Sequence, residues 1–327
     1  MRAVEAPTIV AQKKAAAAEH PNSWVYLNGR FVRYHEARVG LAAHALHHGT
    51  ACLEGMRAYW NAQRGQLFML QPRAHYERLR DSARVLHMSL AESTDELIEI
   101  TLELLRRNHL REDAYVRPIL FKSGEVITPA MDQIEESFAI YVTPYGKHVD
   151  ATNGIRCMVS SWRRIPEQAV PPRAKIAGAY INSCLIKSEA VHHGFDEAIS
   201  LTVDGHVSEA SIANLFMLRH GRFVTPPITD EILEGVTRRV LMGMIRDELG
   251  LDTVERSIDR SELYACDELL LCGTGAELLP VVELDNRPVG DGCVGPRSRT
   301  LRACYAAAVR GESDRYADWT IAVWPDR

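Results

Sequence analysis

A short polar segment at residues 144–154, PYGKHVDATNG, divides the chain into two parts and limits the folds that it can adopt. It contains one proline, two glycines and several polar side chains, a composition typical of a turn or a linker. The chain of 327 residues is too long for one simple hydrophobic core. We therefore expect two domains, or one large α/β domain with an appendage, and we place the interdomain linker at 144–154.

The part before this linker has the pattern of an antiparallel sheet with two helices. Asn28-Gly29 lies between two arms of alternating hydrophobicity, which predicts a hairpin with a type I′ turn. Helical spacing of apolar residues and a Ser-x-x-Glu capping box predict the helices. The expected elements are a hairpin at 24–34, a helix within 71–88, a second helix after Ser93–Glu96, and strands at 114–121 and 137–145.

The part after the linker mixes strands and helices. Asp204-Gly205 and His220-Gly221 interrupt apolar runs, which predicts a meander of strands. The other expected elements are a strand at 154–162, a helix from Gly178 to about His193 capped by Gly194, a helix at 235–250, a strand running into a turn at 267–277, and a helix at 295–312.

Composition excludes several classes of protein. The chain is 46% hydrophobic and 25% charged with a net charge of −5, and no basic stripe is interleaved with aromatic residues, so nucleic acid is not an expected partner. No run of about 18 apolar residues predicts a membrane span. Seven cysteines without a CxxC pair favour the reducing cytosol. No metal is expected, because adjacent histidines such as His47-His48 point in different directions.

Lys175 is set in an unusual environment for a lysine. It follows two prolines and lies among small and apolar residues, just before the predicted helix. A lysine that loses the hydration of its ammonium group is more readily neutral, and a neutral amine can form a Schiff base with a carbonyl. The ordinary alternative is a surface lysine whose stem lies over a loop. Lys175 therefore has to be judged together with the other charged residues.

Other polar residues point to a bound cofactor with an anionic group. Glu209 lies among small and apolar residues, where a carboxylate needs a partner such as a salt bridge or a pyridinium N–H. Gly235, Val236 and Thr237 begin a helix, and such N-termini bind anions, although a simple capped helix is the alternative. Thr274 lies in a Gly-containing turn, CGTGAE, which is a second place where an anion could bind.

Two arginines complete the set of candidates. Arg117 lies on an apolar strand, which is costly unless the guanidinium pairs with an anion or a structural partner. Tyr115, two positions earlier, points to the same face of that strand. Arg78 is the second cation, on the first predicted helix.

Taken together, eight segments in this order resemble the class IV (fold type IV) pyridoxal-phosphate-dependent aminotransferases, and most of all the branched-chain amino acid aminotransferases. They are HALHHGTACLEGMRAY, HYERLRDSARVLHM, YVRPILF, AKIAGAYINSCLIKSEA, VSEASIANLF, TPPITDEILEGVTR, CGTGAELLPV and VGDGCVGP, between about residues 24 and 312. The resemblance implies a two-domain α+β or α/β fold, with a small N-terminal α/β sandwich domain and a larger C-terminal β-barrel-like domain. The implied division is an extension at 1–22, the small domain at 23–143, the linker at 144–154 and a large cofactor-binding domain at 155–327.

The resemblance also implies a role for each candidate residue. Lys175 is the Schiff-base lysine of pyridoxal 5′-phosphate and moves the proton between the substrate Cα and the cofactor C4′. Glu209 pairs with the pyridine nitrogen, and Tyr180 hydrogen-bonds the phenolic oxygen. The residues implied to hold the phosphate are Arg78, Gly235, Val236, Thr237 and Thr274. Tyr115 and the amides of Gly275 and Ala276 are implied to bind the substrate α-carboxylate, and Arg117 the side-chain carboxylate of glutamate. A cytoplasmic homodimer, with each active site built from two subunits, is implied as well.

Some positions depart from the family pattern. His48 stands where a tyrosine is typical, Leu53 replaces an aromatic residue, Tyr145 a tryptophan, His148 a tyrosine and Ala179 an asparagine. The two histidines either replace tyrosine hydrogen bonds to the same carboxylate or make the pocket roomier and more polar. In the second case the substrate is a polar or unusual amino acid.

Different activities of the same fold remain open from the sequence. One alternative is an (R)-selective amine or D-amino acid transaminase, and His48 resembles the amine-type pattern. In contrast, Tyr115 with Arg117, and Gly55 with Arg57, resemble the branched-chain type and mark substrate-binding positions. An aminodeoxychorismate-type lyase and a vitamin B6-binding module without turnover remain open as well. We expect an L-amino acid:2-oxoglutarate aminotransferase that works by a ping-pong mechanism.

Overall fold

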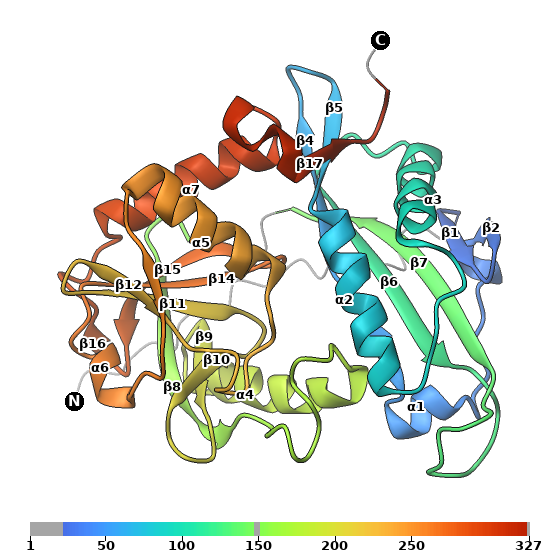
Figure 1. Cartoon of the computed structure of the whole chain (residues 1–327), viewed down its shortest axis with the longest axis horizontal. Coiled ribbons are helices and arrows are strands. Elements are labelled where there is room, and N and C mark those ends of the chain that lie inside the picture. The colour runs from blue at the N-terminus through green and yellow to red at the C-terminus, as the bar shows by residue number, and fades with distance from the viewer. Residues whose placement is uncertain (1–21, 147–150, 326–327) are drawn as a thin grey trace, which may run out of the picture.

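The computed structural model describes residues 22–146 and 151–325. Two β-sheets lie next to each other, and helices cover their faces (Figure 1). The first sheet has the strand order β17-β5-β4-β6-β7-β1-β2, with β3 beside β6. The second has the order β10-β9-β8-β15-β14-β11-β12-β13, with β16 beside β15.

The first part of the chain contains the hairpin and the two long helices that the sequence predicts. Asn28 and Gly29 both have positive φ, 46° and 84°, as a type I′ turn requires. Ser93 and Glu96 exchange both hydrogen bonds of a capping box. The elements of this part are β1 (Trp24–Leu27), β2 (Arg30–Arg33), η2 (Tyr34–Glu36), α1 (His44–His48), β3 (Ala51–Leu53), β4 (Met56–Asn61), β5 (Gln66–Leu70), α2 (Pro72–Val85), α3 (Thr94–Arg107), β6 (Ala114–Lys122) and β7 (Glu136–Pro144).

The second sheet curls on itself. The residues 211–213 join β10, at one edge, to β11, which lies beyond β9, β8, β15 and β14 in the strand order. Such a short connection is possible only if the sheet bends until these two strands approach each other. The predicted meander is therefore two hairpins, β9–β10 and β11–β12, separated by strands from elsewhere in the chain.

The elements after residue 150 form this curled sheet and its helices, apart from the last strand, which joins the first sheet. They are β8 (Ile155–Arg163), η3 (Ala177–Ala179), α4 (Tyr180–His192), β9 (Glu197–Leu201), β10 (Val207–Ala210), β11 (Asn214–Arg219), β12 (Arg222–Thr225), α5 (Val236–Leu249), β13 (Thr253–Glu255), α6 (Arg260–Leu263), β14 (Glu268–Gly273), β15 (Glu277–Leu284), β16 (Arg287–Pro288), α7 (Pro296–Val309), η4 (Asp314–Trp319) and β17 (Thr320–Ala322). None of the helices in the described ranges has the length and apolarity needed to cross a membrane.

The end of the chain returns to the first sheet. Strand β17 pairs antiparallel with β5, and Thr320 lies opposite Leu70. The expected second domain spans residues 155–327, whereas β17 belongs to the first sheet. A strand of three residues carries too short a pattern to be recognised, and its pairing partner lies far away in the sequence.

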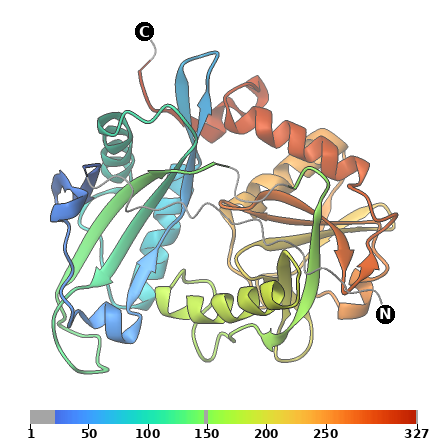
Figure 2. The same cartoon turned by 180° about the vertical axis from the view of Figure 1, so that it is seen from behind.

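The connection between β8 and α4 lies against both parts of the molecule. Leu53 of β3 donates its backbone N–H to the carbonyl of Lys175 at 3.1 Å, and Cys52 forms an isolated β-bridge with Ile176. Figure 2 shows α4 from behind, with its N-terminal end nearer to the first sheet. These contacts place Lys175 between the two sheets.

Candidate active site

A cavity of about 340 Å³ lies between the two sheets and is lined from both of them. It brings together most of the residues that the sequence singled out. Those lining it are Gly55, Arg78, Tyr115, Arg117, Tyr145, Lys175, Tyr180, Glu209, Gly235, Val236, Thr237, Thr274 and Gly275. The elements β6, α2, β10, the start of α5 and the β14–β15 turn therefore converge on one site.

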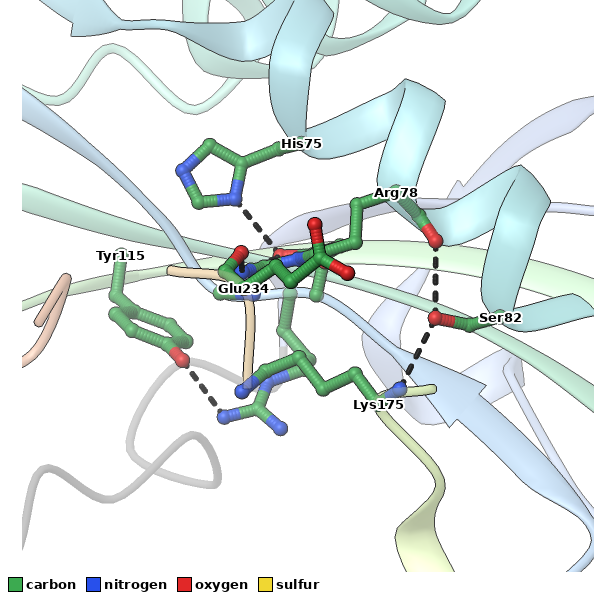
Figure 3. A network of polar contacts seen from close by, with 9 residues as sticks. His75, Arg78, Ser82, Tyr115, Lys175 and Glu234 are labelled. Atoms are coloured by element: carbon green, nitrogen blue, oxygen red, sulfur yellow. Dashed lines mark hydrogen bonds and ion pairs between the residues drawn. The ribbon is translucent and has the colours of Figure 1, made fainter. Parts of the chain in front are cut away.

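Lys175 is held by its backbone, so that its side chain enters the cavity. Its N–H donates to Oγ of Ser82 at 3.0 Å, and Ser82 in turn donates to the carbonyl of Arg78 at 2.9 Å (Figure 3). The Nζ atom lies 5.3 Å from the centroid of the Tyr180 ring. Ala174 and Ile176 on either side are buried, which agrees with the apolar surroundings expected from the sequence. Helix α2 of the first part thus anchors the backbone of Lys175.

Glu209 is a buried carboxylate at the end of β10, with only 4% of its surface exposed. One oxygen pairs with Nη2 of Arg164 at 2.6 Å, and the other accepts from Nδ2 of Asn214 at 2.8 Å and from N–H of Leu233 at 3.1 Å. Burial raises the pKa of Glu209, and the charge of Arg164 opposes that rise. Because a carboxylate can accept about four hydrogen bonds, one position remains for a donor in the cavity.

A site suited to a phosphate group lies at the start of α5. Gly235 is the N-cap residue, and no side chain caps the first amides of the helix, at Val236 and Thr237. Arg78 reaches this helix end from the first part of the chain and donates from Nη1 to the carbonyl of Glu234 at 2.8 Å. A Cβ atom at position 235 would lie 1.9 Å from Oδ1 of Asn214, so this position needs glycine.

Two buried residues behind Arg78 were not recognised in the sequence. Glu54 accepts from Nε and Nη2 of Arg78 at 2.7 and 2.8 Å, and its Oε2 lies 2.7 Å from Nδ1 of His75. Burial favours the neutral form, but Arg78 and His75 hold the pKa of Glu54 well below its usual range. The only hint in the sequence was that LEG and HYERLR, which carry these residues, lie inside two of the segments that resemble the family.

Tyr115 and Arg117 form the opposite wall of the cavity. Arg117 donates from Nη2 to Oη of Tyr115 at 2.8 Å, and its Nε is buried without a partner among the described residues. Burial raises the pKa of Tyr115 to about 12, against the opposing charge of Arg117, so the phenol stays protonated and can donate. The Tyr145 ring lies 5.0 Å from that of Tyr115. This wall can bind a carboxylate.

Other predicted residues lie outside the cavity of the single chain. Arg57 is buried, and its guanidinium pairs with Glu277 at 2.6 Å and with Asp113 at 3.3 Å. Leu53 is buried in β3. Ala276 lines a second, neighbouring cavity and not the one that contains Lys175. His48 is exposed on α1 and stacks on His44 at 4.2 Å between ring centroids. His148 falls outside the described residues.

The comparisons with known proteins decide the family. Residues 51–284 match the family model described as amino-transferase class IV. The chain belongs to the class IV aminotransferases.

Similar proteins cover almost the whole of this class IV aminotransferase. A probable branched-chain-amino-acid aminotransferase of Aquifex aeolicus is 44% identical over 92% of this chain and 97% of its own length. The PLP form of the branched-chain amino acid aminotransferase from Thermobaculum terrenum is 34% identical with a TM-score of 0.89, covering 94% and 100% of the two chains. A branched-chain amino acid aminotransferase from T.th., in complex with N-(5′-phosphopyridoxyl)-L-glutamate, is 35% identical with a TM-score of 0.87, covering 92% and 99%.

This class IV aminotransferase is an enzyme that depends on pyridoxal 5′-phosphate, as its family does, and it has the predicted fold. The cavity fits the cofactor, because a lysine amine, a buried carboxylate with an unused acceptor position and a helix N-terminus with an arginine all face it. When bound, pyridoxal 5′-phosphate withdraws electrons from the amino acid α-carbon and makes its proton removable.

A substitution at Gly55 tests the wall formed by Tyr115. A Cβ atom at position 55 would lie 2.0 Å from Oη of Tyr115, so Gly55→Ala must displace the phenol from Arg117. Because small misplacements in an active site are costly, we expect kcat/KM for the amino acid to fall about 10- to 100-fold. Steady-state kinetics measure this loss of activity, and thermal unfolding of the variant measures any change in stability.

The matched control is Gly243→Ala in the interior of α5, where the nearest atom to the new Cβ is 4.0 Å away. This change should leave kcat/KM unaltered and stabilise the helix by up to about 1 kcal/mol. Equal activity of the two variants would contradict a role for Tyr115 in the site.

Proposed function

We propose that the enzyme moves the amino group of an L-amino acid, branched-chain or related, to 2-oxoglutarate by a ping-pong mechanism and so forms L-glutamate. The observation that carries the proposal is the convergence of Lys175 and Glu209 in one cavity with the Arg117–Tyr115 wall. Similar proteins are named branched-chain aminotransferases, and one of them is described with a phosphopyridoxyl-L-glutamate complex. An arginine that faces a cavity suits the second carboxylate of glutamate or 2-oxoglutarate.

The roles that we propose for these residues are those that the resemblance to the family implies. Nζ of Lys175 holds the cofactor covalently and carries the proton between the substrate Cα and the cofactor C4′. Glu209 accepts the N–H of the ring, and Tyr180 hydrogen-bonds the phenolic oxygen. The phosphate is held by Arg78, the amides at the start of α5, and the Thr237 and Thr274 side chains. The substrate α-carboxylate is bound by Tyr115 and the amides of the turn at Gly275 and Ala276.

The visible spectrum of the purified holoenzyme tests this function. L-Glutamate alone should bleach the band of the lysine-bound cofactor, and a 2-oxo acid should restore it. Bleaching by L-isoleucine, L-valine or L-leucine identifies the second substrate. Bleaching only by a D-amino acid or by (R)-1-phenylethylamine, or release of pyruvate without any 2-oxo acid, would replace the proposal with a different activity of the same fold.

We further propose that the enzyme is a homodimer with an active site shared between subunits. An exposed apolar surface is formed by α1, the residues before it and the loop that follows β6, and His44 links these segments through its hydrogen bonds to Gly124 and Thr128. Its members are Val39, Leu41, Leu46, Val126 and Ile127, of which Ile127 is 98% exposed. Apolar surfaces of this kind mark interfaces. Sedimentation velocity of the holoenzyme should show a dimer or a larger even assembly, and a monomer would overturn the proposal.

We propose that the enzyme acts in the cytoplasm. All seven cysteines are unpaired, and four of them are buried, which suits a reducing compartment. Fractionation of cells that make the protein, followed by detection of the transaminase, tests the location.

The substrate range is a prediction that involves His48 and Leu53. His48 lies on α1 beside the apolar surface, so in the proposed dimer it can approach the neighbouring subunit's cavity. We expect His48→Tyr/Leu53→Phe to shift the preference from polar toward branched-chain amino acids by about tenfold, the size of a small change in a pocket wall. The ratios of kcat/KM on L-isoleucine and on polar amino acids measure it. Unchanged ratios would show that these positions do not set the range.

A further inference from the structure

Glu54 is a carboxylate with no exposed surface, at the corner between β3 and β4. A buried charge is costly unless it is paired and hydrogen-bonded. Glu54 also accepts the N–H of Gly55 at 3.3 Å, besides its contacts with Arg78 and His75. All of these partners lie on α2 or next to the cavity, so this charge is directed toward the cofactor site.

The hydrogen bonds of the Arg78 guanidinium indicate the role of Glu54. The two carboxylate oxygens take one N–H each from Nε and Nη2, and the carbonyl of Glu234 takes one N–H from Nη1. A guanidinium has five N–H groups, so one remains on each Nη nitrogen. The bidentate pair fixes the plane of the guanidinium, and the two remaining donors can bind two oxygens of one anion.

His75 also contacts the carboxylate. It lies three residues before Arg78 on α2, so both side chains project from the same face of the helix (Figure 3). Both of them reach Glu54. Burial lowers the pKa of His75, against the charge of Glu54, and Nδ1 of the ring lies 2.7 Å from Oε2 of that carboxylate. Neither His75 nor Glu54 lines the cavity.

We infer that Glu54 and His75 are positioning residues that orient the Arg78 guanidinium toward the phosphate of the cofactor. The inference rests on the proposed role of Arg78 in binding that phosphate. Helix α2 already packs on the sheet through Tyr76, Leu79 and Ala83, so the fold has apolar contacts at this place. A buried ionic group is often replaceable by apolar residues without loss of stability. Because α2 already has these apolar contacts, we attribute the hydrogen bonds between Glu54 and Arg78 to ligand binding and not to the stability of the fold.

The test compares two ligands of the full-length apoprotein that differ only in the phosphate. Apparent dissociation constants are measured for pyridoxal 5′-phosphate and for pyridoxal, and inorganic phosphate is added as a competitor. Glu54→Gln keeps the shape of the side chain but presents an amide N–H₂ to Arg78. We expect its affinity for pyridoxal 5′-phosphate to fall about 10- to 100-fold, as for other residues that orient a ligand-binding group. The affinity for pyridoxal should stay the same, and competition by phosphate should weaken in parallel.

Two further variants keep the inference testable if Glu54→Gln folds poorly. Glu54→Asp keeps the charge but cannot reach both nitrogens, so it should also lose affinity. His75→Phe keeps the ring and removes one hydrogen bond, and a loss of about three- to tenfold is expected. The control is Glu262→Gln, which removes a carboxylate paired with Arg219 and Arg256 far from the cavity. It should lower the unfolding temperature without changing either dissociation constant.

The outcomes separate the inference from the proposed function. If Arg78→Ala abolishes the preference for the phosphorylated ligand and the Glu54 and His75 variants retain it, the positioning role is wrong and the phosphate site stands. Tighter binding by Glu54→Gln would likewise overturn it, because the carboxylate would then only weaken the charge of Arg78. If Arg78→Ala itself retains the preference, the proposed phosphate site fails, and the inference fails with it.

Discussion

Replacing Lys175 with alanine will lower kcat for transamination by about 10⁴-fold or more, because in the proposed mechanism one amine both holds the cofactor and carries the proton. Lys175 is the sole lysine among the described residues that line the cavity, so no neighbouring amine can take its place. Single-turnover kinetics with L-glutamate measure the loss. The band of the lysine-bound cofactor should disappear from the visible spectrum, although the phosphate site still binds the cofactor.

A matched control is available on α4. Lys187 is a partly exposed lysine that pairs with Glu197 outside the cavity, and Lys187→Ala should leave kcat within about twofold, as expected of a residue away from the site. Added methylamine should restore part of the activity of the Lys175→Ala variant, since it supplies the missing proton carrier. Activity of Lys175→Ala near that of the wild type would remove this residue from the mechanism.

Replacing Glu209 with glutamine should give the second largest effect, a decrease of about 10²- to 10³-fold in the rate of the half-reaction with L-glutamate. Glutamine keeps the volume and can still accept a hydrogen bond, but it carries no charge to stabilise a protonated ring nitrogen. Arg164 would then face a neutral amide at the position where it now pairs at 2.6 Å. Stopped-flow absorbance separates the slowed proton transfer from any loss of cofactor.

Glu197→Gln is the control for this experiment. Glu197 is similarly buried on the adjacent strand β9 and pairs with Lys187, but it does not line the cavity. This variant should lose stability and keep its half-reaction rate within about twofold. If the two glutamine variants react equally fast, a charge opposite the ring is not needed in this enzyme.

The sequence indicated functional residues best where a residue was unusual for its immediate neighbours in the chain. A lysine and a glutamate inside apolar runs indicated a site, and Lys175 and Glu209 do meet in one cavity. The glycine at the start of α5 and the Asn28-Gly29 turn are likewise properties of a few neighbouring residues. In each case the backbone or the burial of a charge restricts the residue type, which makes the pattern readable in one sequence.

Features that depend on distant contacts could not be predicted. Glu54 is 24 residues from Arg78, and its role becomes visible only when β3 and α2 pack together. Arg57 pairs with Glu277, 220 residues away, and no local pattern indicates this contact. The return of β17 to the first sheet has the same origin. Pairing between segments far apart in the chain leaves no local pattern.

The attachment of Lys175 has a consequence for recombining the two parts of the molecule. By its position in the chain the lysine belongs with the second sheet. Its backbone, however, is hydrogen-bonded to Leu53 and Ser82 of the first part. A chimera that joins the first half of one homologue to the second half of another would inherit a reactive amine from one parent and its anchorage from the other. The two halves are therefore not interchangeable modules, and the enzyme should tolerate exchange only when these anchoring contacts are exchanged with it.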